Sequence, residues 1–210
     1  MHPRLPRTAL PVGRHSNGAL ALIALFALLI VSLAALPSCG GDDDDGSDSG
    51  TSSAATTAAD LTPDLSSKGL TITQSGKAAG STQNQDAFTA QFAGPTGAGK
   101  VVAARTDVNL HPTVDAATQQ YGAISEALRN PPPDLFGPNA TQDDNAPVFQ
   151  ADQVKSYKTA KTDVNGTRVY TDAYRMGRAV VIVYVIGPDG AETDAVRKLA
   201  AQKINEKAPR

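Results

Sequence analysis

Nucleophilic and metal-binding side chains are scarce in this chain of 210 residues. It has one cysteine, Cys39, and three histidines, of which His2 and His15 precede that cysteine. A hydrolytic triad needs a histidine base, so His111 is its one candidate after residue 39, and no G-x-S-x-G string accompanies it. A zinc site would need carboxylates to complete it, which is unusual. We therefore predict no catalytic residue, no metal site and no cofactor, and expect His111 to be a surface residue at a strand end.

A glycine-rich string, Gly94-Pro95-Thr96-Gly97-Ala98-Gly99-Lys100, fits the first seven positions of a phosphate-binding loop. The eighth position of that loop needs a Ser or Thr hydroxyl for magnesium, and Val101 has none. The loop must also lead into a helix N-terminus, whereas the residues from Val101 onward have the composition of a strand. The string therefore predicts a hairpin connection.

Carboxylates leave one catalytic alternative open. Asp107, Asp163, Asp172 and the neighbouring Asp143 and Asp144 could supply a pair for acid–base chemistry. Most carboxylates are solvated surface charges, so a carboxylate-dependent hydrolase is the less favoured alternative.

Tyrosine and arginine alternate with other residues between Arg168 and Arg175. In a strand, Arg168, Tyr170, Asp172 and Tyr174 share one face. Cross-strand packing with an ion pair is one interpretation. The other is a candidate interaction patch, because Tyr and Arg are enriched at the centres of protein interfaces.

The charge of the chain changes along its length. Residues 1–38 have a net charge of +3, residues 39–64 of −7 and residues 65–210 of +2. No part of the last segment has the clustered Lys and Arg that nucleic-acid binding needs, so nucleic acid is not an expected partner. Residues 18–36 contain no charged side chain, a pattern typical of a signal peptide or a membrane anchor.

The end of this uncharged run resembles the lipobox of bacterial lipoproteins. Leu36, Pro37 and Ser38 precede Cys39, and Leu36 and Ser38 match the large and small residues of that motif, whereas Pro37 departs from it. The resemblance implies that Cys39 receives a diacylglycerol and becomes the new N-terminus after cleavage. Two acyl chains anchor a protein stably, whereas one binds only marginally. An idle thiol behind an uncleaved anchor is the alternative.

Residues 40–60 contain no large apolar side chain. Gly, Ser, Thr and Asp bury too little surface to offset the entropy of ordering, so we expect residues 39–60 to be a disordered, acidic tether. The expected organisation is therefore a signal peptide over residues 1–38, this tether, and one domain over residues 61–210.

Hydrophobic periodicity predicts two similar halves in the domain. The first has strands over residues 70–73, 87–92 and 101–108, then a helix from about 114 to 128 with apolar residues at spacings of three and four. Three prolines end that helix, and a polar loop of about 20 residues follows, a length typical of functional or mobile loops. The second half has strands over residues 156–164, 167–175 and 179–186, then a helix from about 192 to 207. The strand over residues 179–186 is apolar on both faces, as in a central strand covered on two sides.

This order predicts an α+β fold, with antiparallel meandering sheets of about six strands and two packed helices. The architecture resembles the extracytoplasmic domains of PsbP-type and LpqN-type lipoproteins. We expect a protein anchored in the cell membrane by lipid on Cys39, facing outward, which binds a small ligand or an envelope protein and is not an enzyme. A structural or assembly subunit of an envelope complex is the alternative, and the expected contact region is the loop over residues 130–150.

Overall fold

The structure is a computed structural model that describes residues 56–78, 86–129, 141–143, 147, 151–159 and 166–207. All of these residues belong to one compact unit over residues 37–210. The expected signal peptide and lipobox lie outside the described residues. Within the described part of the chain, no helix is long and apolar enough to cross a membrane.

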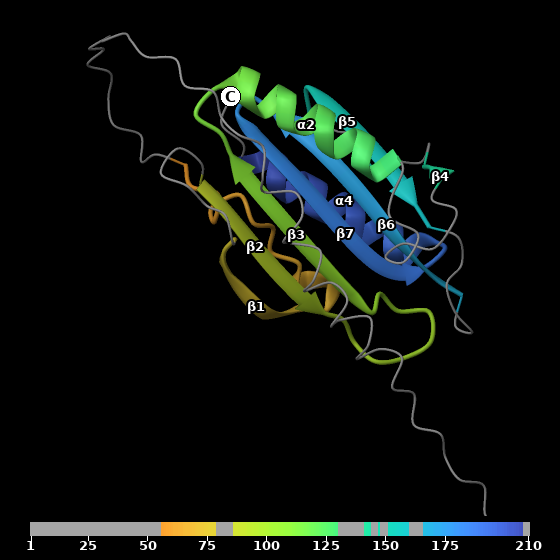
Figure 1. Ribbon diagram of the computed structural model, residues 1–210. Helices are drawn as coiled ribbons and strands as arrows, with labels where there is room; N and C mark the ends of the chain where they lie inside the picture. Colours follow the sequence, from red (N-terminus) through yellow and green to blue (C-terminus); the bar gives the residue numbers. More distant parts are fainter. Residues whose placement is uncertain are drawn as a thin grey trace, which may run out of the picture. The chain divides into compact units, whose positions relative to one another are not determined.

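The centre of the domain is one antiparallel sheet with the strand order β1-β2-β3-β7-β6-β5-β4 (Figure 1). The strands span Thr71–Lys77 (β1), Asp86–Ala93 (β2), Ala103–Leu110 (β3), Thr141–Gln142 (β4), Gln153–Lys158 (β5), Thr167–Met176 (β6) and Ala179–Pro188 (β7). The predicted α+β class with an antiparallel sheet and packed helices is confirmed. The strand number is corrected from about six to seven, because the two residues of β4 are too short for a periodic pattern.

Two long helices, α2 (Val114–Arg129) and α4 (Ala191–Lys207), cover opposite faces of this sheet (Figure 1). The contacts of two neighbouring residue pairs in β5 and β6 agree with this arrangement. Ser156 pairs with Asp172, and the next residue, Tyr157, pairs with Thr171. Successive residues of a strand point to opposite faces. The Tyr157 hydroxyl donates to the carbonyl of Ser125 in α2, whereas Asp172 binds α4.

Strand β7 lies in the middle of the sheet, between β3 and β6. Every residue from Ala179 to Gly187 is buried, and α2 and α4 both contact this strand. A strand covered on both faces needs apolar residues at successive positions, which Ala179–Ile186 supply. The prediction of a central strand is confirmed.

The core on the α4 face also includes the segment before β1. Ala58, Leu61 and Leu65 are fully buried and pack in the same cluster as Val196 and Ile204 of α4. Asp86, at the start of β2, accepts a hydrogen bond from the amide of Ala58 at 2.6 Å. The ordered domain therefore begins before residue 61, where the expected tether would still continue.

Candidate functional site

The predicted patch of Arg168, Tyr170, Asp172 and Tyr174 does share one face of β6, because its residues alternate in the register with β7. That face lies beneath α4. Tyr170 is 5% exposed, and Asp172 and Tyr174 are fully buried. The structure therefore corrects the idea of an accessible interaction patch, because three of its four side chains lie in the core. The alternative interpretation, strand packing with an ion pair, matches the arrangement.

The ion pair comes from a residue that the strand pattern did not include, Arg197 of α4. Its Nε donates to Asp172 Oδ2 at 2.9 Å, and its Nη2 donates to Asp172 Oδ1 at 2.6 Å. A two-point guanidinium–carboxylate contact fixes both groups in orientation as well as in distance. The Ser156 hydroxyl donates to the same Asp172 Oδ1 at 2.5 Å, so three elements meet at this carboxylate.

A second carboxylate, from the residue that follows the edge strand β4, also binds Arg197. Asp143, directly after β4, accepts a hydrogen bond from Arg197 Nη1 at 2.8 Å and one from Lys158 Nζ at 3.2 Å. Both Asp143 and Arg197 are almost completely buried, while the Lys158 side chain is 30% exposed. Asp194 lies 3.7 Å from Arg197, and its side chain is about half exposed. We refer to Arg197, Asp172, Asp143, Lys158 and Ser156 as the Arg197 network.

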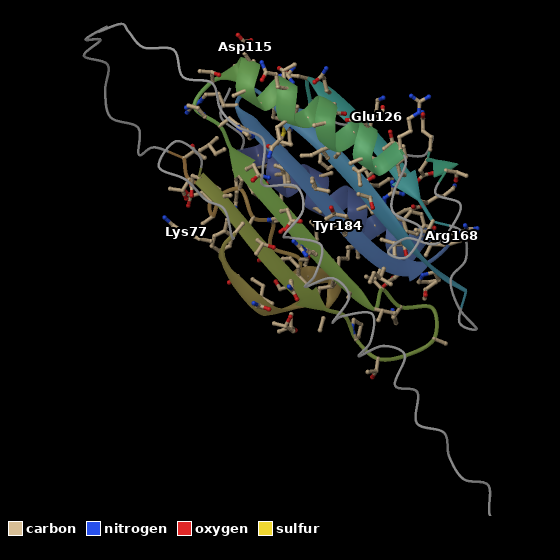
Figure 2. The ribbon with its side chains drawn as sticks, in the orientation of Figure 1. Lys77, Asp115, Glu126, Arg168 and Tyr184 are labelled. Carbon is tan, nitrogen blue, oxygen red and sulfur yellow. The ribbon has the colours of Figure 1, made fainter. Side chains whose placement is uncertain are left out.

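The aromatic ring of Tyr170 contacts the Arg197 network on the sheet side. The Arg197 guanidinium carbon lies 4.8 Å from the centre of the Tyr170 ring, within the range of a cation–π contact. The Tyr170 hydroxyl donates to Asp189, which also binds Arg168 Nε. Figure 2 shows Arg168 toward the end of the sheet where the β6 ribbon begins. Burial first, and then Asp189, raise the pKa of Tyr170 well above its ordinary value.

The charges of this network stabilise one another. Burial alone would lower the pKa of Arg197, but the paired Asp172 and Asp143 carboxylates raise it above its ordinary value. Burial alone would raise the pKa of Asp143, but Arg197 and Lys158 hold it below the ordinary 3.8. Arg197 and Asp143 are therefore both charged at neutral pH. Leaving a buried charge without its partner is costly, so the network needs all its members.

The chemistry that this arrangement supports is charge pairing. A general acid needs a raised pKa at neutral pH, whereas the pKa of Asp143 is lowered. The Ser156 hydroxyl is bonded to a carboxylate that Arg197 already occupies, so it lacks the base that activates a serine nucleophile. Two of the predicted candidate carboxylates, Asp172 and Asp143, do converge, but they converge on a guanidinium.

A second polar group lies on the α2 face of the sheet. Asp107 Oδ1 accepts from Thr89 Oγ1 at 2.7 Å and from Arg105 Nε at 2.8 Å, and Tyr184 pairs with Arg105 in the register of β3 and β7. Figure 2 shows Tyr184 on the middle part of β7. Burial raises the pKa of Tyr184, and Asp107 adds to the effect. Asp107 is thus a partner of Arg105 and Thr89.

His111 directly follows β3, as predicted for a strand end, but it is 8% exposed and not a surface residue. Its Nε2 is hydrogen-bonded to Gln120 Oε1 of α2. Burial lowers the pKa of His111, while the bond to Gln120 opposes this effect. Gln120 of the helix that follows contacts this position, which sequence position alone does not show.

The glycine-rich string forms a hairpin connection between β2 and β3, as predicted. The amide of Gly94 donates to the carbonyl of Val102 at 2.8 Å, and Val101 is buried in the core. Lys100 lies on the surface, 3.4 Å from Glu192. A strand follows the loop, so the helix N-terminus that a phosphate-binding loop requires is not there.

The other predicted features are placed only in part. Cys39 and the lipobox residues Leu36, Pro37 and Ser38 lie outside the described residues, as do Asp144 and Asp163. Among the described residues, no group of three or more His, Cys, Asp and Glu side chains is placed to hold a metal ion.

The sequence prediction missed Arg197. One feature of the sequence could have identified it, because Arg197 is a charged residue at helical spacing within the buried stripe of α4.

Comparisons with known proteins add a weak likeness in fold. No model of a protein family matches the chain, and no curated protein matches it in sequence. Among solved structures, the extracellular domain of PknH from Mycobacterium tuberculosis matches with a TM-score of 0.41 and 14% identity. The match covers 66% of this chain and 66% of that domain, so about a third of the neighbour's length has no counterpart. A likeness of this size carries no argument about function.

Proposed function

We propose that the protein is a lipoprotein of the bacterial cell envelope, held by lipid on Cys39 at the outward face of the cell membrane. The observation that carries this proposal is the position of the single cysteine, directly after Leu36-Pro37-Ser38 at the end of an uncharged run of 19 residues. A diacylglycerol on the cysteine would supply the two acyl chains that stable anchoring needs. The folded domain then extends outward from the membrane.

Metabolic labelling with radioactive palmitate tests the anchor. The full chain should incorporate label and sediment with membranes, whereas Cys39→Ser should do neither. A matched control moves the thiol, combining Cys39→Ser with Ser47→Cys, which keeps one cysteine but removes it from the lipobox. Label on either variant would contradict the proposal, since lipid transfer would then not depend on Cys39 in its context.

We further propose that the anchored domain binds a ligand or protein and does not catalyse a reaction. The support is the Arg197 network, in which the buried carboxylates are paired with cations and the serine hydroxyl with a carboxylate. Such pairing holds charges in place but leaves no group poised to transfer a proton.

The second candidate, a carboxylate-dependent hydrolase, takes its support from the same convergence of Asp143 and Asp172. A panel of ester and glycoside substrates separates the two candidates. Turnover by the full chain that disappears in a folded Asp172→Asn variant would favour the hydrolase and overturn the binding proposal. In that case an Asp115→Asn variant, which changes an exposed carboxylate of α2, should keep the turnover. We expect no turnover by any of the three proteins.

A further inference from the structure

The place of Asp143 in the Arg197 network differs from that of Asp172. Asp172 belongs to β6, which is paired along ten residues with β7. Asp143 follows a strand that has two residue pairs with β5, and its own amide adds one hydrogen bond to the carbonyl of Ser156 at 2.9 Å. The preceding residues, Thr141 and Gln142, are exposed. The network thus combines one carboxylate from the centre of the fold with one from a short edge strand.

The Arg197 guanidinium and the backbone of Lys158 are held in position without Asp143. Arg197 is fixed by its two hydrogen bonds to Asp172 and by the Tyr170 ring. Lys158 ends β5, and its backbone is fixed by pairing with Tyr170 of β6. A preformed pair of donors that converges on one carboxylate has the arrangement of a binding site, because little ordering is needed when the carboxylate arrives.

The charge of the site also requires an anion. Without Asp143, the buried Arg197 and the half-buried Lys158 would have Asp172 as the one buried carboxylate of the network. The half-exposed Asp194 would remain 3.7 Å from Arg197. Arg197 would keep Asp172, but the Lys158 ammonium, which is 30% exposed, would lose its carboxylate partner. A partly buried charge without a partner is unfavourable. A carboxylate from another source would restore the balance.

We propose that Arg197 and Lys158 form a carboxylate-binding site that the chain's own Thr141–Asp143 segment occupies, and that an extended acidic peptide segment is the external ligand that replaces it. This inference rests on the proposed binding function and gives it a ligand class. The internal segment shows the mode of binding. Its backbone extends the sheet along β5, and the side chain of its last residue enters between the two cations. Strand addition supplies affinity through the backbone, and the buried contact supplies specificity.

The test uses the full-length protein with Asp143→Ala and two synthetic peptides, acetyl-Thr-Gln-Asp-amide and acetyl-Thr-Gln-Asn-amide. We expect the variant to bind the Asp peptide about tenfold or more tightly than the Asn peptide, since hydrogen bonds to charged groups discriminate by such factors. The wild-type protein should bind the Asp peptide at least about tenfold more weakly than the variant does, because its own segment competes. Adding Lys158→Met to the variant should reduce the preference for the Asp peptide.

A second measurement keeps the proposal testable if Asp143→Ala does not fold. In the wild-type protein, the amide of Asp143 is bonded to Ser156, and its hydrogen exchange should accelerate with the Asp peptide but not with the Asn peptide. Equal binding of both peptides by the folded variant, or unchanged exchange in the wild type at saturating peptide, would overturn the proposal. Palmitate labelling is independent of these outcomes, so lipid anchoring can stand if the carboxylate site fails.

Discussion

Arg197 and Asp172 form a buried ion pair, and its contribution to the stability of the fold depends on both members being present. Replacing a buried pair by apolar residues of similar size is often neutral, whereas removing one member leaves an unpaired charge. Both side chains are about 1% exposed, so solvent cannot compensate for the loss. The guanidinium is also held by Asp143, which links the central sheet to the residue after β4.

The first prediction follows from this burial. Asp172→Ala should lower the free energy of unfolding by about 3–5 kcal/mol, because Arg197 and Ser156 lose a shared partner. Glu206→Ala is the matched control, since its ion pair with Lys203 is exposed and should contribute much less to stability. Urea unfolding followed by circular dichroism measures both. Equal losses in the two variants would show that the Arg197 network contributes no more than a surface pair.

His111 gives the domain a dependence on pH near neutrality. Its folded-state pKa is lowered by burial below the ordinary 6.5, so the unfolded chain binds the proton more readily. Stability from the neutral ring is therefore complete above about pH 6.5 and is lost as the pH falls below that value toward the folded-state pKa. The neutral ring can donate its Nε2 proton to Gln120 Oε1.

The second prediction is that the free energy of unfolding falls between pH 7.5 and pH 5, and that most of this fall disappears in His111→Gln. The other histidines, His2 and His15, are in the N-terminal segment. Double replacement of these two by Gln is the control and should leave the fall unchanged. The same dependence on pH in His111→Gln would assign it to another group.

At the scale of the elements, the connection between β7 and α4 is closely packed. A Cβ on Gly187 would lie 2.4 Å from Thr193 Oγ1 and 3.2 Å from Val101 Cγ2. That threonine hydroxyl donates to the carbonyl of Pro188 at 2.6 Å, so it is held and cannot move aside without losing this bond. A side chain at residue 187 would thus push α4 away from the sheet.

The third prediction compares two glycines of the sheet. Gly187→Ala should lower the free energy of unfolding by about 1–3 kcal/mol, the usual cost of overpacking a core. Gly76→Ala is the control, because Gly76 lies in the edge strand β1 and an added Cβ would meet nothing within 4 Å. Thermal unfolding of both variants measures the difference. A larger loss in Gly76→Ala would contradict the packing assigned to the β7–α4 connection.

The elements also show how far the sequence could predict this structure. The long strands β6 and β7 and both helices have strong periodicity, and each was predicted within a few residues. The two-residue strand β4 has no period to detect, and β5 begins earlier than predicted. Periodicity identifies a buried face but not its neighbour. The sequence therefore indicated that β7 is covered on both faces, but not which helix covers which face or that Tyr170 and Tyr174 lie beneath α4.

The residues of the candidate site could also be predicted only in part, because the sequence does not show which side chains meet in the fold. Asp143 and Asp172 were recognised only as two of several carboxylates, and the residue that joins them is 25 positions from Asp172 and 54 from Asp143. A charged residue in the buried stripe of a helix indicates an ion pair, so Arg197 could have been selected from the sequence. Its partners depend on strand register, which requires the folded sheet.

For the whole molecule, the boundary between the domain and the expected tether lies earlier than composition suggested. Residues 56–60 are small or polar, and they resemble the tether in sequence. Ala58 is nevertheless fully buried, and Leu61 and Leu65 continue the same packed segment. These residues cover the α4 face of the sheet together with Leu70 and α4. Composition could not locate this boundary, because the buried Ala58 is a small residue of the same kind as those in the expected tether.

The fourth prediction uses two truncations on either side of this segment. A chain that begins at Thr56 should unfold with the same urea midpoint as one that begins at Gly40, because the expected tether contributes no buried surface. A chain that begins at Ser66 loses Ala58, Leu61 and Leu65, which are all fully buried. Burial of each leucine contributes about 1.5–3 kcal/mol, so this truncation should lower the free energy of unfolding by several kcal/mol. An unchanged urea midpoint after the second truncation would contradict the prediction, because the segment would then lie outside the folding unit. A lower urea midpoint after the first truncation would show that the acidic residues 40–55 contribute to the folded domain.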